Sequence, residues 1–124
     1  MLAFKGEVQL ESAELAHTIV DTMDDRQAAD IVMLDIRSIS LITDYFVIGT
    51  GETRRQLSAI TDSILRTVRE NSGNKPLAIE GAPESGWIIL DYGDVVVHVF
   101  APEEREYYKL EQFWEEATLV VRIQ

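Results

Sequence analysis

Two apolar segments joined by a short acidic turn constrain the fold of this chain more than any other feature. They extend from Gly86 to Phe100, with Asp91-Tyr92-Gly93-Asp94 at the turn between them. Such a pattern predicts a β-hairpin, with antiparallel strands over 87–90 and 95–100. Turns usually consist of small polar residues. A tyrosine flanked by two aspartates therefore indicates a surface that contacts another molecule.

Two helices are indicated before the hairpin. The first is predicted to begin near Ser12, a suitable N-cap, and its apolar stripe ends at Met23. The second is predicted to begin at Thr53, because Thr53 and Gln56 have the spacing of a capping box, and to end at Gly73. Its apolar side chains recur every three or four residues and so share one face; they are Leu57, Ile60, Ile64, Leu65 and Val68.

Short apolar runs predict three more strands, over 31–34, 44–50 and 77–79. A last helix is predicted from Pro102 to Glu116, because proline is favoured at the first helical position. The order of helix, two strands, helix, three strands and helix predicts an α/β (α+β) fold, with a mixed five-stranded sheet and flanking helices. Residues 119–123 could add an edge strand or dock elsewhere.

Length and composition favour a single soluble domain over residues 1–124. The chain has no repeat, no linker-like segment and no apolar run of the roughly 18–20 residues that span a bilayer. Its first residues lack the pattern of a signal peptide. Cysteine is absent, which excludes disulfides and thiolate chemistry. Together these features predict a cytoplasmic location.

Negative charge is concentrated in the last third of the chain. The net charge is −11, and residues 80–124 contain ten acidic and three basic residues. Such a surface repels a phosphate backbone and favours a basic protein as partner. The plainer alternative is that the acidic residues only increase solubility.

Asp91 and Asp94 have three alternative roles: they could hold a divalent cation, anchor the turn, or contact a partner. The candidate third ligand closest in sequence is His98, which lies roughly 13 Å from Asp94 along an extended strand. That distance disfavours a shared metal site, so no metal is predicted. A histidine within a strand is more often a neutral structural residue than a catalyst.

A nucleotide-binding module is the alternative function. Gly49-Thr50-Gly51 precedes a helix whose free N–H groups could meet a phosphate, with Arg54 close by. The Gly-Lys-Ser/Thr of a phosphate-binding loop does not follow. No serine lies in a Gly-x-Ser-x-Gly motif either. We therefore predict neither a catalytic residue nor a cofactor.

Aromatic residues in the last predicted helix suggest a partner-binding face. Tyr107, Leu110 and Trp114 recur at helical spacing and would lie on one face with Glu111. Tyrosine and tryptophan combine a large apolar body with a polar tip, which suits an interface. Core packing is one alternative, and a homodimer interface formed by this aromatic face is another. Tyr108 falls on a different face and is a candidate for exposure.

These residues resemble the signature of the ribosomal silencing factors, also called the Iojap family. The run from Leu90 to Phe100 is similar to that signature with hardly a change, and so are the later residues Arg105, Tyr108, Leu110, Glu111 and Trp114. A second block, Asp44 to Ile48 with Thr50, Gly51, Arg55 and Gln56, resembles the other family motif. The resemblance extends from the first predicted helix to Trp114.

The resemblance implies a function and a fold. Members of the family bind the large ribosomal subunit through its fourteenth protein, keep the subunits apart and lower translation when nutrients are scarce. Their fold is related to that of nucleotidyltransferases, they are not known as enzymes, and homodimers are common. We therefore predict a cytoplasmic translational repressor whose partner-binding residues are Trp87, Asp91, Tyr92, Asp94, His98, Arg105, Tyr108, Glu111 and Trp114.

Overall fold

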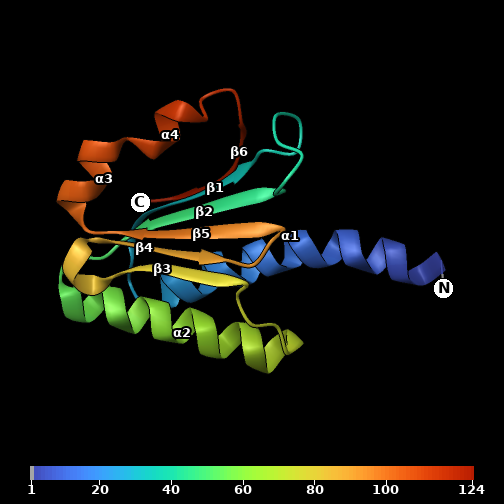
Figure 1. Cartoon of the computed structure of the whole chain (residues 1–124), viewed down its shortest axis with the longest axis horizontal. Coiled ribbons are helices and arrows are strands. Elements are labelled where there is room, and N and C mark those ends of the chain that lie inside the picture. The colour runs from blue at the N-terminus through green and yellow to red at the C-terminus, as the bar shows by residue number, and fades with distance from the viewer. Residues whose placement is uncertain (1) are drawn as a thin grey trace.

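The computed structural model describes the backbone of residues 2–124 and the side chains of residues 12–124. Its centre is one mixed sheet of six strands in the order β3-β4-β5-β2-β1-β6 (Figure 1). Strands β2 and β5 run parallel and the other neighbours run antiparallel. The strands are β1 (Ala29–Asp35), β2 (Tyr45–Thr50), β3 (Ala78–Ala82), β4 (Trp87–Asp91), β5 (Val95–Phe100) and β6 (Thr118–Ile123).

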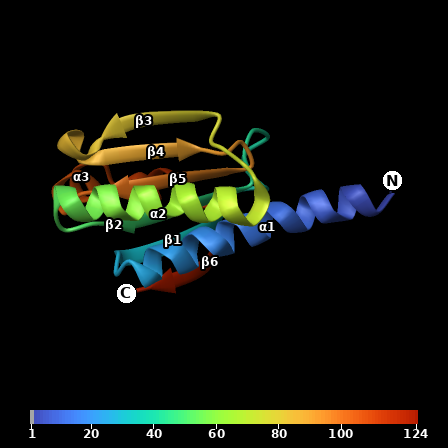
Figure 2. The ribbon, with the colours of Figure 1, turned by 90° about the horizontal axis from the view of Figure 1, so that it is seen from below.

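Helices cover both faces of this sheet. The long helices α1 (Leu2–Asp25) and α2 (Arg54–Ser72) lie side by side on one face (Figure 2). The short helices α3 (Pro102–Tyr108) and α4 (Leu110–Phe113) lie on the other (Figure 1). A single 3-10 turn, η1 (Pro83–Ser85), joins β3 to β4. The molecule is therefore a three-layer α+β fold in which the layer of α3 and α4 is much the smaller.

Alternation along β5 shows how the two faces differ. Val95, Val97 and Val99 belong to the main core beneath α1 and α2. Phe100 belongs to a second, smaller core beneath α3 and α4. Successive side chains of a strand point to opposite faces, so His98 also lies on the side of α3 and α4. The one buried polar residue of β5 is thus placed on the less covered face.

The start and end of α2 agree with the sequence. The Thr53 hydroxyl accepts a hydrogen bond from the N–H of Gln56 at 3.1 Å, and Gly73 closes the helix in the left-handed conformation. The Gln56 side chain does not return to Thr53. Its oxygen accepts from the N–H of Glu52 at 2.7 Å, and its amide nitrogen donates to the Gln27 carbonyl at 3.0 Å. The cap therefore also joins α2 to the end of α1.

The prediction of a five-stranded sheet was wrong, because residues 118–123 form a sixth strand. The alternative that residues 119–123 add an edge strand is confirmed. Strand β6 pairs antiparallel with β1 and becomes the edge of the sheet. Its side chains Val121 and Ile123 pack against the main core. Without this strand, the apolar residues Ile31 and Met33 of β1 would lie at an open edge.

The predicted start of the first helix was also wrong. Helix α1 begins at Leu2, and Ser12 is a buried residue within it. Serine is favoured at an N-cap, but a serine in the sequence does not by itself mark where a helix begins. The predicted apolar stripe is confirmed, since Ala16, Ile19, Val20 and Met23 are buried in the main core. No helix in the described part of the chain combines the length and apolar character needed to cross a membrane.

The last predicted helix is divided in two. Lys109 has a φ of 48°, in the left-handed region, and this breaks the helix between α3 and α4. The four residues assigned to one face are consequently separated: Tyr107 is 80% exposed, whereas Leu110 and Trp114 pack against the second core. The break allows the chain to turn back onto the sheet, where the rings of Phe46 and Phe100 offer apolar surface.

Candidate protein-docking surface

Six ring-bearing side chains gather between the sheet and helices α3 and α4. The ring of Trp87 stacks on that of Phe100, with centroids 4.8 Å apart, and also contacts Tyr108 at 4.6 Å. On the other side of the group, Phe46 meets His98 at 4.9 Å and Trp114 at 5.1 Å, both edge to face. We call this group the aromatic cluster; it comprises Phe46, Trp87, His98, Phe100, Tyr108 and Trp114.

Strand register brings the cluster together. Trp87 of β4 lies opposite Phe100 of β5, and Val96, next to His98 on the same face of β5, lies opposite Phe46 of β2. Trp87, His98, Tyr108 and Trp114 were predicted from the sequence as site residues, whereas Phe46 and Phe100 were not. Alternation within a strand does place Phe100 on the same face as His98, and Phe46 on the same face as Ile48. The sequence alone did not show that these two strands are neighbours.

His98 is a neutral structural residue in this arrangement. The Trp87 indole N–H donates to Nδ1 of His98 at 3.2 Å, so the proton of the neutral imidazole resides on Nε2. That Nε2 is buried and has no hydrogen-bond partner among the described residues. Burial lowers the pKa of His98 to about 4, and the opposing effect of the Glu111 charge is smaller. The geometry therefore favours the structural interpretation over a catalytic one.

Acid should weaken the fold through His98. Its folded-state pKa lies below the ordinary value of 6.5, so the unfolded chain binds a proton first as the pH falls. Between pH 7 and pH 4 the free energy of unfolding should fall by about 3 kcal/mol more in the wild type than in His98→Gln. Urea titrations at several pH values measure this difference. Parallel pH profiles for the two proteins would contradict the prediction.

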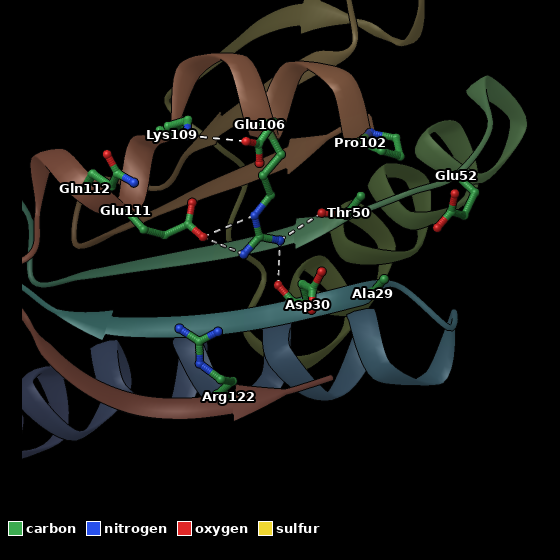
Figure 3. A pocket seen from close by; sticks show the side chains of 11 residues that line it. Ala29, Asp30, Thr50, Glu52, Pro102, Glu106, Lys109, Glu111, Gln112 and Arg122 are labelled. Atoms are coloured by element: carbon green, nitrogen blue, oxygen red, sulfur yellow. Dashed lines mark hydrogen bonds and ion pairs between the residues drawn. The ribbon is translucent and has the colours of Figure 1, made fainter.

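Arg105 of α3 forms a clamp to α4 and to the ends of two strands. Figure 3 labels its three partners, Asp30, Thr50 and Glu111. Its guanidinium donates to the Glu111 carboxylate at 2.9 and 3.3 Å, to the Thr50 hydroxyl at 2.8 Å, and to the Asp30 carbonyl. Only 12% of the Arg105 side chain and 31% of the Glu111 side chain are exposed. Both residues were predicted to bind a partner. Their polar groups are bonded to each other and to the sheet, and their contact with a partner stays a prediction.

The β1 backbone has an unusual conformation at the residue that bonds Arg105. Asp30 has a φ of 48° at an irregularity in the pairing of β1 with β2, and its carbonyl oxygen meets the Arg105 guanidinium. A non-glycine residue in this conformation is strained. The clamp borders a polar cavity of about 460 Å³ between α3, α4 and the strand ends. Figure 3 shows Arg122 of β6 on the opposite side of this cavity from Glu111.

The two aspartates of the hairpin turn have different environments. One oxygen of Asp91 accepts the N–H of Gly93 at 2.8 Å, which is the turn-anchoring role. Asp94 has an exposed side chain, while its carbonyl accepts the N–H groups of Asp44 and Tyr45. By alternation Asp91 lies on the same face of β4 as Trp87, roughly 13 Å further along.

Tyr92 is not part of the aromatic cluster. Its half-buried ring packs against the main core, on the side of α1 and α2. Its hydroxyl is buried without a hydrogen-bond partner among the described residues. Burial raises its pKa to about 12. The sequence grouped Tyr92 with Trp87 and Trp114 on one outer patch; the structure places it on the opposite face of the sheet.

Neither the metal nor the nucleotide alternative gains support from the geometry. Among residues 12–124, no three histidine or carboxylate side chains lie close enough to hold an ion. In the Gly49-Thr50-Gly51 segment, the N–H of Gly51 donates to the Phe100 carbonyl at 2.9 Å. The Thr50 hydroxyl is occupied by Arg105. Groups that a phosphate would need are thus already bonded within the protein.

An aromatic cluster at the surface, an acidic turn and a supporting clamp are typical of a module that binds another macromolecule. Comparison with known proteins identifies which one. The family model "Ribosomal silencing factor during starvation" matches residues 9–124. The chain is 46% identical to ribosomal silencing factor RsfS of Bacillus subtilis over 96 residues, covering 77% of this chain and 80% of that protein. It is 39% identical to RsfS of Halalkalibacterium halodurans, covering 90% and 94%.

Solved structures agree with this result. A crystal structure of a Chromobacterium violaceum protein superposes with a TM-score of 0.79 at 30% identity, covering 83% of this chain and 85% of that one. The chain therefore belongs to the ribosomal silencing factor (RsfS/Iojap) family, as the sequence motifs predicted. It is a non-enzymatic factor that binds the large ribosomal subunit and blocks its joining with the small subunit.

Proposed function

We propose that the protein docks on the fourteenth protein of the large subunit through the aromatic cluster and the acidic turn. The observation that carries the proposal is the exposure of aromatic side chains on the face of the sheet that Asp91 shares. Tyr108 is 43% exposed, Trp87 and Trp114 are half buried, and Asp94 is exposed. Large amphipathic rings at a surface are typical of binding hot spots.

The two kinds of residue have different roles in this proposal. Carboxylates of Asp91 and Asp94 pair with basic side chains of the partner, which mainly speeds encounter and fixes orientation. The rings of Trp87, Tyr108 and Trp114 supply most of the binding free energy by leaving water. His98, Arg105 and Glu111 hold these rings in place from beneath, and Tyr92 fixes the turn to the main core.

Further properties of the family extend the proposal. We infer that the whole chain, residues 1–124, acts as one domain in the cytoplasm, that it lowers translation when nutrients are scarce, and that free molecules form homodimers. A relation of the fold to nucleotidyltransferases stays a prediction of the family resemblance. The mixed sheet with helices on both faces is compatible with it.

Sedimentation with separated ribosomal subunits tests the docking proposal. The protein should pellet with large subunits and not with small ones, and it should bind the purified fourteenth protein in isolation. When mixed with both subunits, it should reduce the amount of whole ribosome in a sucrose gradient. Binding to large subunits without binding to the isolated fourteenth protein would contradict the assignment of the partner.

Reversing the charge of the turn should abolish this binding. The double variant Asp91→Lys with Asp94→Lys places two cations against a basic partner, and we expect at least a tenfold rise in Kd. Asp91→Asn removes the charge but keeps an oxygen that can accept the Gly93 N–H. It therefore shows the effect of the lost charge while the turn remains anchored. Isothermal titration against the fourteenth protein measures both.

A matched control places the same charge change elsewhere. Asp24→Lys with Asp25→Lys alters two exposed carboxylates at the end of α1, away from the aromatic cluster. This control should bind with nearly the wild-type Kd. If the turn variant binds like the control while keeping its melting temperature, the site assignment is wrong.

A further inference from the structure

Positive charge gathers on one part of this acidic protein. The chain carries a net charge of −11, yet residues 54–75 contain five basic and two acidic residues, a local net charge of +3. These residues form α2 and the segment that leads from it to β3. The basic residues are Arg54, Arg55, Arg66, Arg69 and Lys75.

The cations are exposed and available. Arg55, Arg66 and Arg69 lie within one sector of the helix, because each residue advances about 100° around the axis. Arg55 and Arg69 are therefore roughly 21 Å apart along α2. Their side chains and that of Lys75 are exposed, and none of them makes an ion pair with another described residue. A row of unpaired cations of this length can meet several negative charges at once.

Three of these cations border a groove between α2 and β3. The groove has a volume of about 420 Å³, and three cations and one carboxylate border it: Arg66, Arg69, Lys75 and Asp62. Leu65 and Ile79 form its apolar side. Ile79 is 54% exposed because β3 is an edge strand. Figure 2 shows α2 beneath the middle of the sheet, with β4 and β3 to one side of it, and the groove lies on that side. We call Arg66, Arg69 and Lys75 the basic groove.

The basic groove adjoins the acidic turn across the β3 edge. The N–H of Leu77, two residues after Lys75, donates to the carbonyl of Asp91 at 2.7 Å. A Cβ atom on Gly93 would lie 3.3 Å from the Leu77 side chain. A partner that wraps around the turn and the β3 edge reaches Lys75 first, and then Arg69 and Arg66 on the face of the sheet opposite the aromatic cluster.

We propose that the basic groove, together with Arg55, contacts ribosomal RNA phosphates of the large subunit beside the protein on which the acidic turn docks. This inference rests on the proposed function, because it requires the turn to face the subunit. The way the cations are spaced along α2 favours RNA over an acidic protein segment. The cations continue along α2 beyond the groove, with no matching row of exposed apolar side chains there.

Contact with both a basic protein and RNA phosphates explains why the chain has separate acidic and basic surfaces. The acidic turn and the aromatic cluster suit a basic protein, and the basic groove suits the phosphates that surround such a protein on a ribosomal subunit. Each phosphate contact releases counterions, so this part of the affinity should fall steeply with salt. The aromatic contacts should be much less sensitive to salt.

A charge-reversal variant tests the proposal. In Arg66→Glu with Arg69→Glu and Lys75→Glu, the Kd for large subunits should rise at least tenfold in 100 mM KCl. The slope of log K against log salt should become smaller by about 2 to 3, as expected for three lost phosphate contacts. The Kd for the isolated fourteenth protein should not rise. Unchanged affinity and slope on subunits would overturn the proposal.

A gain-of-function variant provides the matched control. Asp62→Lys with Glu70→Lys removes the two acidic residues from the same surface and should tighten binding to subunits at low salt. Circular dichroism and melting curves check that each variant folds. If the triple reversal unfolds, the same three positions changed to glutamine retain the test, with a smaller expected rise in Kd.

Photocrosslinking identifies the class of molecule in contact. Benzoylphenylalanine in place of Glu70 keeps all the cations and lies on the exposed side of α2. On large subunits it should give an adduct that is degraded by ribonuclease. An adduct with a ribosomal protein, or none at all, would overturn the RNA contact. If the wild type gives this adduct but does not bind the isolated fourteenth protein, the choice of protein partner is wrong and the RNA contact stands.

Discussion

Gly81→Ala is expected to cost about 3–5 kcal/mol of the free energy of unfolding and to separate β3 from β4. Gly81 has a φ of 82°, in the region that favours glycine. A Cβ atom there would lie 1.9 Å from the backbone carbonyl oxygen of Trp87. Because the obstacle is backbone rather than a flexible side chain, only a shift of the strand can relieve the clash.

Gly73→Ala is the matched control for this change. Gly73 has a φ of 75°, close to that of Gly81, but a Cβ atom added there would meet no atom within 4 Å beyond its immediate neighbours. Its substitution should therefore cost only about 1 kcal/mol, the penalty for the left-handed backbone. Urea unfolding of the two variants separates the conformational cost from the clash. Equal losses of stability would contradict our account of Gly81.

The loss at Gly81 should extend to function. Trp87 begins β4 directly opposite Ala82, and its carbonyl also accepts from the Ser85 hydroxyl at 3.2 Å. A displaced β3 therefore moves the backbone that holds the indole in the aromatic cluster. We expect Gly81→Ala to weaken binding to large subunits even at temperatures where it stays folded, whereas Gly73→Ala should not.

Arg105→Leu is the second change with a large expected effect. It removes the donors to Glu111, Thr50 and Asp30 together, and it leaves a partly buried carboxylate without its partner. Breaking a buried ion pair from one side typically costs about 3–5 kcal/mol. Glu111 is 31% exposed, so water compensates in part, and we expect a loss of about 2–3 kcal/mol. Hydrogen exchange should show the loss in α3 and α4 first.

Lys109→Ala is the control for this region. Lys109 forms an exposed pair with Glu106 at 3.3 Å, and such pairs contribute less than about 1 kcal/mol. The comparison also distinguishes the two roles of Arg105. If the residue acts as a clamp, Arg105→Leu lowers stability and binding together. If it contacts the partner directly, binding falls while the melting temperature and the exchange of α3 and α4 stay at wild-type values.

Arg105→Lys refines the same test. A lysine keeps the charge but has one nitrogen where arginine has three, so it cannot serve Glu111, Thr50 and Asp30 at once. We expect it to recover only a small part of the lost stability. Full recovery would mean that charge alone matters at this position.

Nearness in sequence did not by itself show which candidate residues lie on the same face of the sheet. Trp87, His98 and Tyr108 do share one cluster. Tyr92 lies between two residues of the same turn and yet packs on the other face of the sheet. Arg105 and Glu111 were predicted to bind a partner, and the structure adds a bond between them that the sequence did not indicate.

The sequence by itself determined the elements whose cause is local. The hairpin of β4 and β5, the cap and apolar face of α2, and the family motifs depend on residues a few positions apart. Only the tertiary structure decided what depends on distant partners. Strand β6 pairs with β1 across more than 80 residues, and Arg105 bonds Thr50 and Asp30 at separations of 55 and 75 residues. Local periodicity shows which face of an element is apolar, but not which element covers it, because that choice follows from how all the layers pack at once.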